Sequence, residues 1–304
     1  MSYRGRIAPT PTGLLHIGHA ATFSTAHRRA RDAGGEILLR IEDLDPQRCQ
    51  PEFSTTAMED LKWLGLDWDG EPVFQSQRRC HYLKAWERLR DTGFLYPCHR
   101  SRKEISTLAP HSEEPIFPSH WRRDPEEAKS FASPTGMNWR FRVPDGECIS
   151  FRDGNFGTVE KLAGRDFGDF LIWNRDDIPA YELAVVVDDI LTGITEVVRG
   201  ADLLTSTARQ ILLHQALGAK PPEWFHCALL CDAQGNRLAK RTGGLEIQTL
   251  RNQGKTPAQV LSGEARFLKN QGSRDWRMAR SRTFRDTSSC SMPVESKRRS
   301  AVDS

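Results

Sequence analysis

Two histidines three residues apart, His16 and His19, are the first side chains whose type and spacing could do chemistry. They follow residues 9–13, whose two prolines and glycine exclude regular structure. If a helix begins at this point, its unpaired N–H groups and partial positive charge attract phosphate. Both imidazoles could then donate to phosphate oxygens that gain charge during a displacement, and Gly18 would let a ligand ring approach the backbone. The alternative, a helix start that carries two histidines by chance, does not account for the residues before them.

The elements that must position these histidines can be predicted from the apolar pattern. Arg4 to Ala8 is a short run that can form a strand, and the residues from Leu15 to Asp32 can form a helix that Gly34 and Gly35 stop. Glu36 to Ile41 is a second apolar run, typical of a buried parallel strand. This strand–helix–strand order predicts an α/β fold.

Three carboxylates follow the second strand, at Glu42, Asp43 and Asp45. Ligands of open α/β sheets lie outside the carboxyl ends of the strands, so this is a position for substrate contacts. A capped turn into the next helix, predicted over Glu52–Leu64, explains Asp45 and Pro46 equally well. We therefore assign Glu42 to the substrate and Asp45 to the helix cap.

Cationic side chains follow later elements. Arg199 comes just after a β-branched run, Ile194–Val198, and its planar guanidinium matches a carboxylate; a surface ion pair is the alternative. Lys240 lies in a polar, glycine-containing stretch, residues 232–244. A lysine on such a loop could close over a triphosphate and neutralise the charge that leaves with pyrophosphate.

Length and composition suit a soluble globular protein of 304 residues, with 38% hydrophobic and 27% charged residues. No apolar run approaches the roughly 18 residues of a membrane span. The seven cysteines are scattered and odd in number, and no leader precedes the first strand, so we expect a reducing, cytoplasmic location. The net charge is +3, but residues 265–304 carry ten basic and four acidic residues, leaving the first 264 at −3. An RNA partner would then meet local basic patches.

These stretches resemble the class I aminoacyl-tRNA synthetases, and their glutamyl branch in particular. Residues 6–19, which read Arg-Ile-Ala-Pro-Thr-Pro-Thr-Gly-Leu-Leu-His-Ile-Gly-His, match the ATP-binding signature. Residues 40–45 match the Arg-Ile-Glu-Asp-x-Asp stretch, and residues 168–176 are close to a third family pattern. Residues 236–241, Asn-Arg-Leu-Ala-Lys-Arg, resemble the second signature, the Lys-Met-Ser-Lys-Ser loop, with its second lysine kept as Lys240.

The resemblance covers about residues 3–262 and implies the domain organisation. It implies a Rossmann-like catalytic domain in two halves, residues 1–93 and 166–245. Residues 94–165 would form an inserted α+β subdomain and residues 246–264 a short helical extension. Residues 265–304, rich in serine and arginine, would be a disordered basic tail.

The resemblance also implies the site residues, with ATP and its Mg²⁺ as cofactors. The catalytic residues would be His16, His19 and Lys240. The ATP-binding residues would be Thr12, His16, Gly18, His19, Arg237 and Lys240. The glutamate-binding residues would be Arg6, Ala8, Thr10, Glu42 (on the α-amino group), Tyr181 and Arg199.

Short relatives carry a zinc site in the inserted subdomain, with ligands in the order Cys-x-Cys and Tyr-x-x-x-Cys. Cys98 keeps the first position, whereas Arg100, Phe117 and Trp121 stand at the others. Zinc takes about four N, S or O ligands. The histidines at 99, 111 and 120 could supply a substitute set, but histidines scattered in a loop are more often solvent-exposed. We therefore expect no zinc.

About 60 residues follow Arg241, whereas full glutamyl enzymes continue with a long anticodon-binding region. This resembles the short paralogues that attach glutamate to queuosine in the anticodon loop of tRNA(Asp), as does Glu182 where full synthetases often carry Asn. We expect this activity in a monomer without membrane contact. Two alternatives stay open: a shortened synthetase that charges the tRNA 3′ end, and a catalytically silent module that binds RNA or an adenylate.

Overall fold

The computed structural model describes residues 2–100, 104–105, 116–230 and 246–262 of the protein, and parallel strands form its centre. β1 (Arg4–Ile7), β2 (Glu36–Ile41) and β3 (Val73–Phe74) form one parallel sheet in the order β1-β2-β3. Ile7 lies opposite Leu39, and Ile41 lies opposite Phe74, so the three carboxyl ends face the same edge.

A second sheet continues this arrangement in the order β7-β6-β10-β9. Its strands are β6 (Cys148–Asp153), β7 (Gly157–Leu162), β9 (Glu196–Gly200) and β10 (Glu223–Cys227). β9, β10 and β6 are parallel, and β7 is antiparallel to β6. The two sheets meet at β1 and β9, where the Thr195 N–H donates to the Arg4 carbonyl at 2.8 Å and Arg6 Nη1 donates to the Val198 carbonyl at 2.9 Å. The carboxyl ends of β1, β2, β9 and β10 therefore come together.

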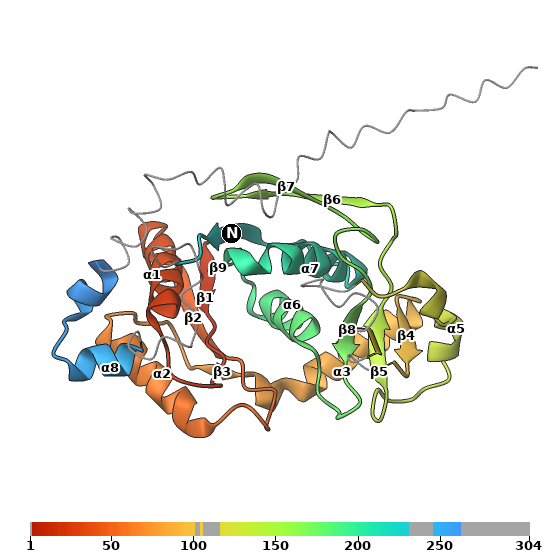
Figure 1. The fold of residues 1–304 in the computed structure, drawn as a ribbon, viewed down its shortest axis with the longest axis horizontal. Coiled ribbons are helices and arrows are strands. Elements are labelled where there is room, and N and C mark those ends of the chain that lie inside the picture. Colours follow the sequence, from red (N-terminus) through yellow and green to blue (C-terminus); the bar gives the residue numbers. More distant parts are fainter. Residues whose placement is uncertain (1, 101–103, 106–115, 231–245, 263–304) are drawn as a thin grey trace, which may run out of the picture.

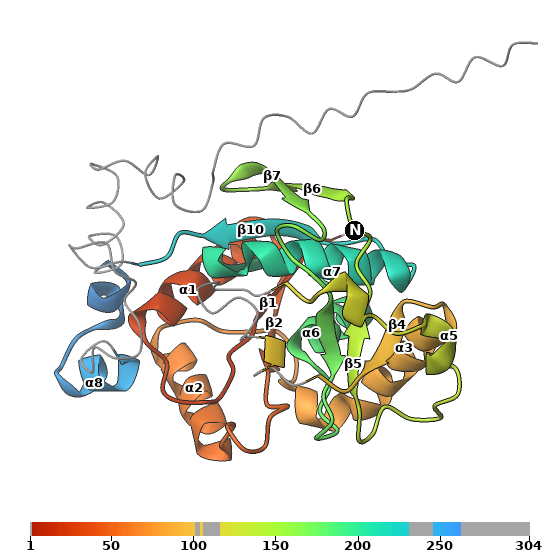
Figure 2. The same ribbon diagram turned by 45° about the vertical axis from the view of Figure 1, so that its right-hand side comes forward.

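A third, antiparallel sheet has the order β4-β5-β8. It consists of β4 (Leu95–Cys98), β5 (Asn138–Phe141) and β8 (Phe170–Trp173), and lies with the short helix α5 (Pro125–Ala128) to the right in Figure 1. The other helices are α1 (Ile17–Asp32), α2 (Pro51–Trp63), α3 (Arg79–Asp91), α6 (Tyr181–Thr192), α7 (Leu204–Ala216) and α8 (Ile247–Asn252). In both views α1 lies beside β1 and α8 near α2, and the β6–β7 hairpin forms the upper edge (Figures 1 and 2).

Two hydrophobic cores hold these layers. One packs α1 and α2 on the first sheet through residues such as Phe23, Leu39 and Leu61. The other joins α3, α6, α7 and the third sheet, with Trp86, Trp139 and Trp173 fully buried. Helix α6 is buried on most sides, since residues 182–189 are all buried, and it ends at Gly193, whose φ of 66° suits glycine.

The predicted elements compare closely with those observed, and the α/β class with a parallel sheet is confirmed. The strand at Glu36–Ile41 has the predicted bounds, and the first helix begins two residues later than predicted. The assignment of Asp45 to the helix cap is wrong. Its carboxylate accepts from the Gln47 N–H at 3.0 Å and shapes a turn, whereas α2 begins after Gln50 with Pro51 as its first residue.

The strand that carries Arg199 begins and ends two residues later than predicted, so this residue lies inside β9 rather than after it. Strand β6 extends to Asp153, and residues 154–156 connect it to β7. Strand pairing also crosses the predicted domain limits, since β8 pairs with β5 and β6 pairs with β10. These limits stay a prediction, and the basic tail lies outside the described residues. No helix in the described part of the chain has the length and hydropathy of a membrane span.

Candidate active site

The N-terminus of α1 is capped by its own two histidines. His16 is the N-cap residue, and its Nδ1 accepts the Gly18 N–H at 3.1 Å. The Nδ1 of His19 accepts the His16 N–H at 3.2 Å, and the two rings stack with centroids 3.8 Å apart. Because each Nδ1 accepts from a backbone N–H, the neutral form of each ring carries its proton on Nε2. Both imidazoles can therefore act as Nε2–H donors at a helix N-terminus, where an anion is favoured.

Gly18 leaves room for the side chain of His16, which the sequence did not indicate. A Cβ at this position would lie 3.0 Å from Cε1 and 3.1 Å from Nδ1 of the His16 ring. The glycine thus admits the ring of the N-cap histidine, while close approach of a ligand ring stays a prediction. Thr12 lies in the preceding turn, where its N–H donates to the Thr10 carbonyl at 2.9 Å.

A buried charge cluster lies at the carboxyl ends of β1 and β2. Arg40 donates to Asp189 of α6 at 2.5 Å and to Glu42 at 3.2 Å. Arg6 Nε is 3.7 Å from the same Asp189 carboxylate, which is an ion pair too long for a hydrogen bond. Burial lowers the pKa of Arg6, against the attraction of Asp189. Asp189 and Arg40 were not among the predicted site residues, although Arg40 opens the family-like stretch of residues 40–45.

Glu42 is held in this cluster by two neighbours. It accepts from Arg40, and the Thr10 hydroxyl is 3.4 Å from its second oxygen. Burial raises the pKa of Glu42, and the guanidinium groups of Arg40 and Arg6 oppose this rise. Ala8 follows β1 and is half-buried. The structure thus places Arg6, Thr10 and Glu42 within one neighbourhood.

Tyr181, the first residue of α6, joins this neighbourhood from the other side. Its hydroxyl interacts electrostatically with Arg199, Glu42 and Arg6. Although 38% of the residue's surface is exposed, burial at the hydroxyl end raises its pKa to about 12. The tyrosine therefore stays protonated at neutral pH and can donate a hydrogen bond.

Arg199 is buried rather than paired at the surface, so the surface ion pair is excluded. Its Nη1 donates to Gln210 at 2.8 Å and its Nη2 to Thr207 at 2.8 Å. Its Nε faces His226 Nε2 at 3.2 Å, and its guanidinium lies 5.0 Å from the centre of the Trp224 ring. The protein itself occupies most of the planar fork, which leaves fewer N–H groups for a ligand than the sequence argument assumed.

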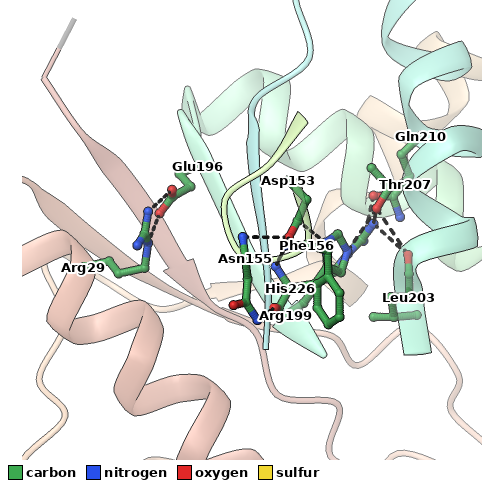
Figure 3. Close-up of polar contacts among 10 residues, drawn as sticks. All are labelled: Arg29, Asp153, Asn155, Phe156, Glu196, Arg199, Leu203, Thr207, Gln210 and His226. Carbon is green, nitrogen blue, oxygen red and sulfur yellow. Dashed lines mark hydrogen bonds and ion pairs between the residues drawn. The ribbon is translucent and has the colours of Figure 1, made fainter. Parts of the chain in front are cut away.

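His226 of β10 contacts Arg199, and Asp153 of β6 contacts His226 in turn (Figure 3). His226 Nδ1 is 2.6 Å from Asp153 Oδ2, and both side chains are inaccessible to solvent. Burial lowers the pKa of His226, with the Asp153 carboxylate opposing the shift. The sequence argument missed both residues. The only available signal was a histidine inside an apolar strand.

Arg6 and Arg40 lie against the carboxylates of Asp189 and Glu42, whereas none of the hydrogen-bond partners printed for Arg199 among the described residues is a carboxylate. Further buried carboxylates act nearby, Asp188 on Arg40 and Glu182 on Arg199. The buried guanidinium of Arg199 can therefore meet a carboxylate of a ligand. The guanidinium groups can bind a carboxylate, and Glu42 beside them can accept from an ammonium group. This arrangement can therefore bind an amino acid.

The second signature falls outside the described residues, so Arg237 and Lys240 have no observed position. The first described residues after this gap lie beside the first signature. Glu246 forms an antiparallel bridge with His16, and the Ile247 N–H donates to the Leu15 carbonyl at 2.9 Å. The segment that carries Lys240 is thus followed directly by residues held at the N-terminus of α1.

The residues at the family's zinc-ligand positions lie together in a small, largely apolar cluster. Cys98 and Phe117 are buried, and Phe117 lies edge-on to Trp121 at 5.7 Å. The guanidinium of Arg100 lies 4.7 Å from the centre of the Trp121 ring. His120 is exposed, as is the histidine at 99, and the one at 111 lies outside the description. Among the described residues, no three His, Cys, Asp or Glu side chains form a metal-ligand group.

Comparison with known families gives one match over nearly the whole chain. Residues 2–297 match the family described as tRNA synthetases class I (E and Q), catalytic domain. The chain is 46% identical over 279 residues to a protein named Glutamyl-Q tRNA(Asp) synthetase from Nitratidesulfovibrio vulgaris, with 87% of this chain and 86% of the relative covered. It is 44% identical over 272 residues to the protein of that name from Symbiobacterium thermophilum, with 84% of each covered.

A solved structure has a similar fold. A glutamate tRNA ligase from Elizabethkingia meningosepticum, in complex with its amino acid, superposes with a TM-score of 0.69 at 30% identity. The match covers 80% of this chain but only 53% of the ligase, so this chain spans about half the length of that protein.

Proposed function

The chain belongs to the family of class I tRNA synthetases for glutamate and glutamine, and from this premise we propose that it activates L-glutamate with ATP and transfers it to queuosine in tRNA(Asp). As a member of this family it is a ligase that joins glutamate to tRNA. The proposal adds the use of ATP, the nature of the acceptor and the residues that act.

The observation that carries the proposal is the arrangement at one edge of the parallel strands. The donors of His16 and His19 lie at the N-terminus of α1, and the buried guanidinium groups of Arg6, Arg40 and Arg199 lie at the ends of β1, β2 and β9. A triphosphate and an amino acid with two carboxylates need these two kinds of environment side by side. Because substrate carboxylate and α-phosphate must meet, positioning and electrostatics would supply most of the rate.

In the proposed first step, an oxygen of the α-carboxylate attacks the α-phosphorus of ATP. The bond to the bridging oxygen breaks, and pyrophosphate leaves. His16 and His19 would donate from Nε2 to phosphate oxygens, and Lys240 would neutralise the departing charge. The proposed Mg²⁺ would accompany ATP and neutralise charge on its phosphates.

The same cluster would hold the glutamate. The carboxylate oxygens would accept hydrogen bonds from Arg199, Arg6 and the Tyr181 hydroxyl. Glu42 would accept from the α-ammonium group. In the second step, a hydroxyl of the cyclopentene ring of queuosine attacks the glutamyl carbonyl, and AMP leaves. An anticodon loop suits this step, since an unpaired base can be splayed out and read.

The choice of acceptor is supported by the relatives named Glutamyl-Q tRNA(Asp) synthetase, which match over most of their own length. The test uses radiolabelled glutamate and tRNA(Asp) from cells that make queuosine and from cells that do not. The terminal 3′ nucleotide is removed with an exonuclease, because periodate would also cleave the diol of queuosine. Label should enter only the queuosine-containing tRNA. Labelling of both tRNAs, lost on trimming, would show a shortened synthetase for the 3′ end, and no label would favour a silent module.

A further inference from the structure

The charge of Arg199 is surrounded by neutral groups. In the described part of the chain its hydrogen-bond partners are Gln210, Thr207, the Leu203 carbonyl and His226, and none of them is a carboxylate. Two buried carboxylates lie one residue further out. Asp153 reaches Arg199 through His226, and Glu182 reaches it through Gln210. Figure 3 shows the first of these connections.

The protonation site of His226 follows from its partners. The Nε–H of arginine can only donate, so His226 Nε2, 3.2 Å away, must accept. The ring proton of neutral His226 is therefore on Nδ1, which donates to Asp153 Oδ2 at 2.6 Å. Burial lowers the pKa of this histidine, and the nearby charges of Arg199 and Arg6 act in the same direction. The neutral ring thus presents its lone pair to Arg199.

The backbone holds Asp153 in place independently of the histidine. Its Oδ1 accepts the N–H groups of Asn155 at 3.0 Å and Phe156 at 2.9 Å, and Oδ2 also accepts the His226 N–H at 3.1 Å. One oxygen is therefore committed to the hairpin turn and the other to β10. Asp153 can hold the histidine in one orientation because its own orientation is fixed.

The amide of Gln210 is oriented in the same way on the other side. Its Nε2 donates to Glu182 Oε2 at 2.7 Å, which leaves Oε1 to accept from Arg199 Nη1 at 2.8 Å. The reversed amide would place an NH₂ group against the guanidinium. Glu182 is itself held by the Ser206 hydroxyl at 2.7 Å.

We propose that His226 and Gln210 are positioning residues, each oriented by a buried carboxylate, that aim Arg199 at a carboxylate of the substrate. Neutral partners fix the guanidinium plane without neutralising its charge by direct contact, so the substrate supplies the first carboxylate that Arg199 meets. The identity of that substrate as glutamate rests on the function proposed above. The orientation of Arg199 in the free protein is independent of that proposed function.

Two amide variants of His226 separate its contact with Arg199 from its contact with Asp153. The side-chain oxygen of His226→Gln can reach the position of Nε2 and accept from Arg199, whereas His226→Asn reaches only the position of Nδ1 and pairs with Asp153. His226→Asn should raise KM for glutamate in pyrophosphate exchange about tenfold to a hundredfold, the factor for one hydrogen bond to a charged group. His226→Gln should raise it less. In both, KM for ATP should not change. Equal effects of both variants, or a loss of thermal stability with an unchanged KM for glutamate, would overturn the proposal.

The acid side of the pH profile gives a second readout. Protonated His226 would place an N–H against the Arg199 Nε–H. The groups that face this ring are Asp153 from β6, Arg199 from β9, Thr207 from α7 and Arg6 from β1. KM for glutamate in the unchanged protein should therefore rise as the pH falls below the usual histidine range, and His226→Gln should lose this rise. A profile that is the same in both proteins would contradict the role.

A third measurement does not depend on any activity. Asp153→Asn must keep its oxygen on the two turn N–H groups, so its NH₂ group faces His226 Nδ1 and moves the ring proton to Nε2. Nitrogen-15 NMR of the free protein should show the Nδ1–H form of His226, and the Nε2–H form in Asp153→Asn. The Arg199 Nε–H signal should lose its protection in Asp153→Asn and in His226→Asn. An Nε2–H form in the unchanged protein would refute the inference. Absent exchange activity with the expected NMR result would instead refute the proposed function.

Discussion

Mild acid should destabilise the protein through His214, a buried residue in the last turn of α7. Only 2% of its surface is exposed, and neither ring nitrogen has a hydrogen-bond partner among the described residues. Burial lowers its pKa from 6.5 to about 4, although the nearby Asp189 charge opposes this. The folded protein therefore keeps His214 neutral at a pH at which the unfolded chain already binds a proton.

The size of the effect follows from this difference. Above pH 6.5 both states are neutral at His214, and the stability contribution is fully present. As the pH falls toward 4, the unfolded state binds more protons than the folded state, so stability is lost. Between pH 6.5 and 5 the difference spans 1.5 pH units, which at about 1.36 kcal/mol per unit is about 2 kcal/mol.

Urea unfolding at pH 8, 7 and 5 measures this contribution when the protein is compared with His214→Leu. The variant removes the two ring nitrogens, which have no hydrogen-bond partner in the described part of the chain, and places an apolar side chain in the helix. From pH 7 to pH 5 it should lose about 2 kcal/mol less of unfolding free energy than the unchanged protein, and between pH 8 and 7 the two should behave alike. Equal losses at pH 5 would refute the reasoning, because His214 would then protonate alike in both states.

Three further results are expected. Arg199→Lys should raise KM for glutamate, because one ammonium group cannot satisfy the three separate acceptors of this guanidinium; a KM that stays the same would remove Arg199 from the binding site. Lys240→Ala should slow pyrophosphate exchange about a hundredfold and change glutamate binding little, since the contact strengthens in the transition state; an unaltered rate would exclude Lys240 from the mechanism. Elemental analysis of the purified protein should show less than one zinc per chain, because Arg100, Phe117 and Trp121 occupy ligand positions; one tightly held zinc, lost on mutating Cys98 together with a histidine, would prove a substitute site.

The sequence was sufficient to predict the parts of the fold that depend on local pattern. The apolar run of Glu36–Ile41 and the glycines after Asp32 gave the bounds of β2 and the end of α1. Asp45 was misassigned because its position before a proline fits a turn and a helix cap equally well. Only the observed start of α2 at Pro51 separates the two.

The long-range contacts could not be predicted in this way. His226 and Asp153 are 73 positions apart, and nothing in their surroundings indicates that they share a hydrogen bond. The pairing depends on β10 lying between β9 and β6, which is a property of the sheet order. For the same reason Arg199 could be proposed as a carboxylate ligand, but not recognised as a buried group whose donors are already engaged by Thr207 and Gln210.

The most direct test of the account is pyrophosphate exchange with the purified protein, ATP and Mg²⁺, in the absence of tRNA. The buried cluster that contains Arg6, Glu42 and Arg199 is complete without RNA, so glutamate should support exchange under these conditions. Glutamine, which lacks the second carboxylate, should support far less, and Arg199→Lys should narrow the difference. Exchange that appears only after tRNA is added, or equal rates with glutamate and glutamine, would contradict the claim that this cluster selects glutamate for activation.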